Sequence, residues 1–242
     1  MPDQVKLLKM NRMDNRENTD SLIAKIRAGI QACLQLDVMK DLPDFLSVDS
    51  EDNPYVYTSG GITFLDDRCV NVVCFGQKPL YCGELYIDSE NGALLKACIE
   101  VQPRYIKRAT RIFVVRQAQN VNLTTQKVVY TISYKPWNGT YYIHHIRGDL
   151  YFKMKKKRVL FSNPTLHTWF EMVTCRVDTE HVVRFSRTER IPTHAVFSDM
   201  NFKYDERFWE DFNVIPLEEE LSRIIEKVAL KIEQIDHPEE SR

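Results

Sequence analysis

Histidine and cysteine are the residues of this chain most suited to chemistry, and their spacing fits no common site. His144 and His145 are adjacent, so in a strand their side chains point to opposite faces and do not readily share one metal ion. The sequence holds no H-x-H, H-E-x-x-H or C-x-x-C spacing of the kind that zinc sites use. The histidines are therefore interpreted as ordinary strand residues, and no metal or other cofactor is predicted.

A nucleophilic site has equally little support. The chain has only 8 glycines and lacks both the G-x-S-x-G elbow of hydrolases and the glycine-rich patterns of nucleotide-binding proteins. The remaining nucleophile and base are a dispersed pair, Cys175 and His167, whose separation in space the sequence does not constrain. No catalytic residue is predicted, and a hydrolase with dispersed catalytic residues is kept as an alternative function.

The six cysteines are interpreted as small buried hydrophobic side chains, because free cysteine is commonly buried. Cys69, Cys74, Cys82, Cys98 and Cys175 fall in predicted strands. A cross-strand disulfide between Cys69 and Cys82, or between Cys74 and Cys98, would form only in an oxidising compartment.

Two further patterns suggest binding. Lys153 and the run Lys155–Arg158 form the one basic stretch. Either it contacts phosphate or an acidic partner, or it is a solvated edge strand whose lysines discourage pairing with other edges. The candidate ligand-binding residues are five aromatic residues near the C-terminus, Phe202, Tyr204, Phe208, Trp209 and Phe212. They line a ligand cavity or, alternatively, fasten a terminal helix to the sheet.

A period of two in the apolar residues runs from Tyr55 to Arg187 and is typical of antiparallel strands. At its centre, Val128–Arg158 is predicted as a three-stranded meander with strands at 128–135, 140–147 and 149–158. Further strands are predicted at 55–58, 62–65, 69–75, 80–88, 93–101, 110–117, 167–177 and 181–187. Because no helical segment is predicted between these strands, parallel βαβ units are excluded.

Two amphipathic helices, at 18–36 and 217–235, flank the strands. Their apolar stripes must be buried, so the predicted fold class is α+β and mainly antiparallel β. It is a curved sheet or half-open barrel of about ten strands packed on an N-terminal and a C-terminal helix. Residues 1–17 are predicted as a linker or disordered start. Residues 18–242 are predicted as a single domain that includes an irregular aromatic segment at 188–216.

Composition narrows the function further. The formal net charge is -1 over 242 residues, so no global basic field attracts nucleic acid. No stretch approaches the roughly 18 apolar residues of a membrane helix, and no transmembrane segment is expected. The polar N-terminus lacks the apolar core of a signal peptide, which predicts a cytoplasmic protein if the chain is complete.

Three segments in order carry a resemblance to a known family: 83–88, 134–148 and 208–216. They resemble the C-terminal half of Bacteroidota envelope proteins of the carboxypeptidase-like regulatory domain-containing family, over roughly residues 55–235. The resemblance implies the later part of a longer exported protein, periplasmic or associated with the outer membrane, with a missing N-terminal domain as a partner. It implies no carboxypeptidase activity, because no zinc-ligand set is present. The strand rhythm is also similar to lipoprotein carriers, in which a half-open barrel holds an acyl chain, a likeness of fold only.

These observations give one leading hypothesis and two alternatives. The leading hypothesis is a non-enzymatic, envelope-associated module that binds a lipid, an acyl chain or a partner segment in an apolar groove. The first alternative is a structural or interaction domain of a larger surface protein, with its groove filled by its own helix and its exposed edges used for binding. The second is the hydrolase named above.

Overall fold

The computed structural model describes residues 4–6, 24–26, 30–47, 53–77, 80–157, 164–180 and 182–194. The chain divides into two units, Met1–Phe208 and Trp209–Arg242, and every described residue lies in the first. The prediction of a single domain from residue 18 onward stays a prediction.

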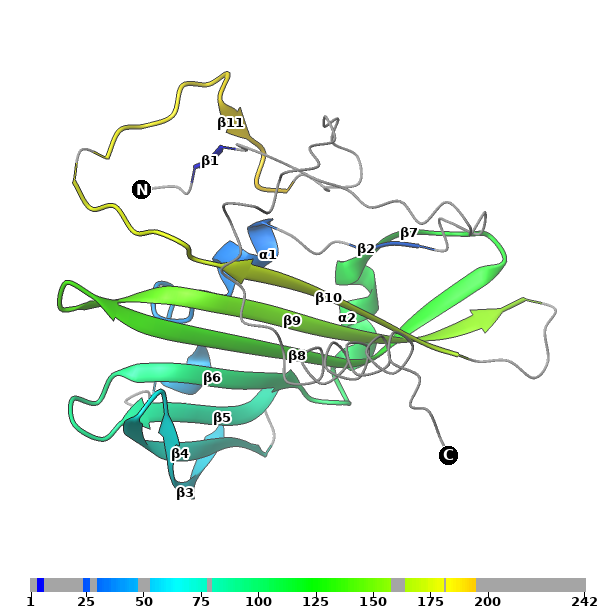
Figure 1. Cartoon of the computed structure of the whole chain (residues 1–242). Coiled ribbons are helices and arrows are strands. Elements are labelled where there is room, and N and C mark those ends of the chain that lie inside the picture. Colours follow the sequence, from blue (N-terminus) through cyan, green and yellow to red (C-terminus); the bar gives the residue numbers. More distant parts are fainter. Residues whose placement is uncertain are drawn as a thin grey trace, which may run out of the picture. The chain divides into compact units, whose positions relative to one another are not determined.

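A seven-stranded antiparallel sheet forms the centre of the described structure (Figure 1). Its strands in spatial order are β10 (Thr165–Val173), β9 (Thr140–Lys156), β8 (Val121–Trp137), β6 (Leu94–Val101), β5 (Tyr81–Asp88), β4 (Arg68–Gln77) and β3 (Tyr55–Leu65). Two small two-stranded sheets pair β1 (Val5–Lys6) with β11 (Arg190–Ile191) and β2 (Ala24–Ile26) with β7 (Val114–Gln117). The predicted class, mainly antiparallel β with a curved open sheet, is confirmed.

One face of this sheet carries the core. The buried residues of the two longest strands alternate along the chain, so they share one face: Val128, Ile132, Ile146, Leu150 and Phe152 are all fully buried. The period of two predicted for these strands is therefore confirmed.

Short helical elements from the N-terminal part cover this face. They are α1 (Ile30–Gln35) and the 3-10 helix η1 (Asp44–Leu46). The ring of Phe45 stacks on Phe75 of β4 at 4.6 Å between centroids. The Tyr134 hydroxyl of β8 donates to Asp37 Oδ1 at 3.0 Å and accepts from the Met39 backbone N–H at 3.3 Å. The core face is thus filled by side chains of the chain itself.

The long hairpin of β8 and β9 corrects the predicted meander. The turn is placed as expected, with Asn138 and Gly139 both at positive φ as a tight two-residue turn requires. The predicted strands at 140–147 and 149–158 are a single strand, because Gly148 continues the ladder and pairs with both Tyr130 and Phe170. A Cβ at Gly148 would lie 2.4 Å from ring atoms of Phe170, so the glycine marks a close approach rather than a break.

One helix prediction and one strand prediction are corrected as well. Of the helix predicted at 18–36, the described residues 24–26 and 30–36 include one helical segment, α1, and Ala24–Ile26 pairs with β7 instead, since tertiary strand pairing overrides a weak helical preference. The first half of the strand predicted at 110–117 belongs to helix α2 (Ile106–Phe113), while its second half, Val114–Gln117, is the strand β7 as predicted. Ile106 and Phe113 lie seven positions apart on one helical face, and both are buried. A helix therefore lies between β6 and β8, although these strands still pair antiparallel.

The strand predicted at 181–187 does not form in residues 182–187. Val182 and Val183 are 74% and 78% exposed, so these apolar side chains do not pack into the core. The strand predicted at 167–177 ends at Val173. The aromatic residues Phe202, Tyr204, Phe208, Trp209 and Phe212 and the helix predicted at 217–235 lie outside the described residues. Within the described part of the chain, no helix has the length and apolar character needed to cross a membrane.

Candidate functional site

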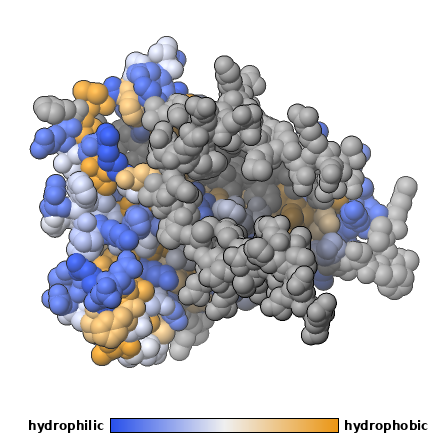
Figure 2. Space-filling model, viewed as in Figure 1, coloured by the Kyte–Doolittle hydropathy of each residue, from blue (hydrophilic) through white to orange (hydrophobic). Residues whose placement is uncertain are grey.

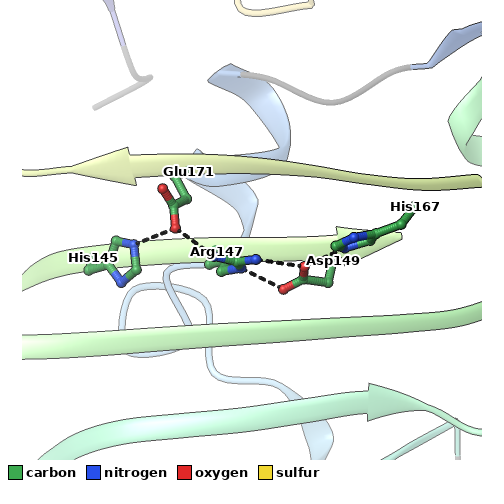
Figure 3. Close-up of polar contacts among 5 residues, drawn as sticks. All are labelled: His145, Arg147, Asp149, His167 and Glu171. Atoms are coloured by element: carbon green, nitrogen blue, oxygen red, sulfur yellow. Dashed lines mark hydrogen bonds and ion pairs between the residues drawn. The ribbon is translucent and has the colours of Figure 1, made fainter. Parts of the chain in front are cut away.

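Five polar side chains from β9 and β10, the two neighbouring strands at one end of the sheet, meet on the face opposite the core (Figure 3). We call His145, Arg147, Asp149, His167 and Glu171 the polar cluster. Alternation along β9 sends odd-numbered residues away from the core side chains of Ile146 and Leu150. The register with β10 then places Glu171 directly opposite Arg147.

Arg147 is the centre of the cluster. Its Nε lies 2.7 Å from Asp149 Oδ2 and its Nη2 3.1 Å from Asp149 Oδ1, a two-pronged contact that matches the planar guanidinium to the carboxylate. Its Nη1 donates to Glu171 Oε1 at 3.2 Å. The Arg147, Asp149 and Glu171 side chains are only 19%, 17% and 13% exposed, so these contacts are partly shielded from water.

The two histidines extend the cluster in opposite directions. His145 Nε2 lies 3.5 Å from Glu171 Oε1, and His167 Nε2 lies 2.7 Å from Asp149 Oδ1. The ring of His167 also stacks on Tyr151 at 4.3 Å with an interplanar angle of 6°. The Arg147 guanidinium lies 5.4 Å from the ring centroid of the exposed Trp169. Aromatic rings therefore border the charged groups on β9 and β10.

The electrostatics of the cluster favour ionised Arg147 and Asp149. Burial alone would raise the pKa of Asp149, but hydrogen bonds from Arg147 and His167 outweigh burial and lower this pKa below its ordinary value. The hydrogen bond to Asp149 raises the pKa of Arg147 in turn. Each carboxylate contacts the Arg147 guanidinium and one imidazole, Asp149 that of His167 and Glu171 that of His145.

Beside the polar cluster lie three exposed lysines, Lys153 and Lys155 within β9 and Lys157 directly after it, which we call the lysine row. Lys153 and Lys155 share the face of Asp149 by alternation. The residues opposite them are uncharged: Thr124 and Asn122 on β8, and Thr165 on β10 across from Lys153. No described carboxylate forms an ion pair with the lysine row. The row is a local positive strip on a chain of nearly zero net charge.

The catalytic alternatives gain little from this geometry. An Asp–His pair becomes a nucleophilic triad only when the second ring nitrogen meets a hydroxyl or thiol. In the described part of the chain, the hydrogen bonds of His167 reach Asp149 and no such group. Cys175 follows the end of β10 while His167 lies near its start, and a strand rises about 3.3 Å per residue. The dispersed pair Cys175 and His167 is therefore not brought together.

The disulfide expectations are also overturned. All six cysteines are free. Glu84 of β5 lies between Cys74 of β4 and Cys98 of β6. Two strand spacings of about 4.8 Å separate that pair, beyond the reach of a disulfide. Cys69 pairs with Phe64 of β3, whereas Cys82 lies at the opposite end of the β4–β5 pairing.

His145 and His167 belong to the polar cluster, although their spacing in the sequence predicts no shared site. His144 contributes the extra residue where the β8–β9 register shifts, and burial lowers its pKa. His145 and His167 meet carboxylates across strands, which sequence spacing does not reveal. Among the described residues, no group of three or more histidine, cysteine, aspartate or glutamate side chains is arranged to hold a metal ion. One local feature of the sequence does point to the cluster: Arg147 and Asp149 are two positions apart in one strand, so their side chains share a face.

Comparisons with protein-family models, with curated proteins and with solved structures find no match to this chain. The resemblance to Bacteroidota envelope proteins and the expected location in the envelope therefore stay predictions.

Proposed function

We propose that this chain is a non-enzymatic binding module that takes an acidic segment of a partner protein along β9, over the lysine row. The observation that supports it best is the lysine row itself, a run of exposed cations whose cross-strand neighbours are uncharged. Positive strips of this kind attract complementary segments and set their register. The resemblance noted above would place such a module at the cell envelope.

The spacing of the row suggests the shape of the segment. Lys153 and Lys155 are two residues apart in a strand, so they repeat every 6.6 to 6.8 Å or so along β9. An extended peptide with a carboxylate at every second position has the same repeat. At one end of the row, the stacked rings of Tyr151 and His167 offer a flat surface for an apolar side chain of the same peptide.

The lipid or acyl-chain form of the hypothesis has less support. A carrier needs space on the apolar face of its sheet, and here that face is packed with the chain's own residues, including Phe45, Val38 and Phe113. The arrangement agrees better with an interaction domain whose groove is filled from within.

Fluorescence anisotropy with a labelled Glu-Thr repeat peptide tests the proposal. We expect the Glu-Thr peptide to bind the full chain more tightly than a Gln-Thr peptide of the same length does. Added salt should weaken the binding of the Glu-Thr peptide. The double substitution Lys153→Thr and Lys155→Thr weakens binding about 2- to 30-fold, since each exposed ion pair contributes roughly 0.2–1 kcal/mol.

A matched control removes two lysines that already have partners. Lys6 lies 2.5 Å from Glu189, and Lys135 lies 3.5 Å from Asp66. Changing both to threonine alters the net charge equally, and binding stays within about 2-fold of the unmodified chain if the site is local. Equal loss in both double variants, or equal affinity for the Gln-Thr peptide, would refute the proposed site.

A further inference from the structure

The edge strand β3 lacks the charged and proline residues that commonly keep sheet edges apart. Its sequence from Tyr55 to Leu65 contains no charged residue and no proline, whereas edges of stable monomers are commonly protected by lysine or proline. In the described part of the chain, β3 pairs only with β4. A register shift between Ser59 and Gly61 interrupts its ladder, and the stretch from Gly61 to Leu65 is then regular.

This regular stretch exposes two large apolar side chains. Ile62 and Phe64 are 69% and 70% exposed, and they share one face because Thr63 lies between them. In Figure 2, hydrophobic side chains gather at the corner of the molecule where Figure 1 draws β3 and β4. Exposure of this kind along an unpaired edge is typical of a docking strand.

We propose that β3 pairs antiparallel with β3 of a second copy of this chain, about a two-fold axis that passes between their Thr63 residues. In this register Ile62 lies opposite Phe64 of the second copy, and Phe64 lies opposite its Ile62. Aromatic and β-branched residues are favourable partners when they lie directly opposite across strands. The strand is therefore complementary to itself, as a two-fold interface requires.

Charge does not oppose this pairing. The acidic turn residues Asp66 and Asp67 fall opposite the uncharged Gly60 and Ser59 of the second copy, so no like charges meet. The net charge of -1 leaves little repulsion between whole molecules. Five residues from each copy is a small contact beside the roughly 20–30 residues per side of a stable complex, so the dimer is weak and depends on concentration.

Sedimentation velocity on the full chain, from about 1 µM to about 1 mM, tests the inference over the range of weak association. The weight-average mass rises from 28.5 kDa towards twice that value as the concentration increases. Thr63→Lys and Thr63→Glu each abolish the rise, because like charges then face each other across the axis. Val182→Lys, at an exposed valine outside the sheet, leaves it unchanged.

An equimolar mixture of the Thr63→Lys and Thr63→Glu chains associates again, since opposite charges now meet at the axis. This restoration requires the proposed register and excludes misfolding as the cause of either loss. A chain that stays at 28.5 kDa throughout the range, or an association that persists in both single variants, would overturn the inference. So would a mixture that fails to associate.

Discussion

Replacing Arg147 by methionine is the most informative test of the polar cluster. The exchange keeps the length of the side chain and removes three hydrogen bonds to Asp149 and Glu171. Loss of one partner of an exposed ion pair costs up to about 1 kcal/mol, and loss of one partner of a fully buried pair costs about 3–5 kcal/mol. With side chains 13–19% exposed, the cluster lies between these limits, and we expect a loss of about 2–4 kcal/mol at pH 7.

The loss should also depend on pH. Because the pKa of Asp149 is lower in the folded chain than in the unfolded chain, its contribution is complete above the ordinary aspartate pKa of about 3.9. That contribution falls as the pH drops through the lower, folded-state value. Near pH 3 the difference between the unmodified chain and Arg147→Met should therefore be smaller than at pH 7.

Urea denaturation at both pH values measures this free energy, with an unchanged m-value as the sign that the folded state is intact. Arg176→Met is the matched control. Arg176 also contacts a carboxylate two residues along the chain, Asp178, but these side chains are 80% and 60% exposed. Its loss should be below about 0.5 kcal/mol. If Arg147→Met costs no more than Arg176→Met, the partial shielding of the cluster has no energetic consequence and the reasoning fails.

Three further predictions concern the scaffold and the site. Gly148→Ala should destabilise the fold by roughly 1–3 kcal/mol in urea denaturation, and Phe170→Leu in the same chain should recover part of this loss; additive losses would contradict the close contact. Tyr134→Phe should cost about 1–2 kcal/mol, because Asp37 loses the hydroxyl donor; a neutral result in the same assay would show that the contact to the N-terminal segment contributes nothing. In a carbon-detected NMR titration, Asp149 should titrate below the ordinary aspartate value, and a midpoint at or above that value would contradict the hydrogen-bonded geometry.

The strands could be predicted because a strand that is buried on one face has an apolar residue at every second position. Val128, Ile132, Leu150 and Phe152 are buried as their alternation predicts, and the turn at Asn138 and Gly139 was marked by residues that tolerate positive φ. Where an element does not have one apolar and one polar face, the spacing of its apolar residues does not decide between helix and strand. This is why residues 110–113, the second half of α2, were predicted as part of a strand, since Ile106–Phe113 is too short for its period to be decisive.

The prediction of a break at Gly148 was wrong for a related reason. In sequence, Gly148 resembles a strand break, but its role is to admit the ring of Phe170 from the neighbouring strand, which lies 22 residues further along the chain. A close approach between distant residues leaves no local signature, so one long strand was predicted as two.

The polar cluster shows the same limit for the site. The pairing of Arg147 with Asp149 follows from their spacing within one strand, but Glu171 and His167 join only through the register of β9 and β10. That register depends on where β10 begins and ends, and the predicted strand at 167–177 differs from the observed one at both ends. The basic run, in contrast, was visible at once, and the structure adds that its cross-strand neighbours are uncharged.

The most direct test of the proposed function is amide chemical-shift mapping of the full chain during titration with the Glu-Thr peptide. The account predicts that the largest shifts lie at Lys153, Lys155 and the adjoining Tyr151 and His167, while residues of the core face such as Ile132 change little. Shifts concentrated on the core face, or none at saturating peptide, would contradict a binding surface on β9.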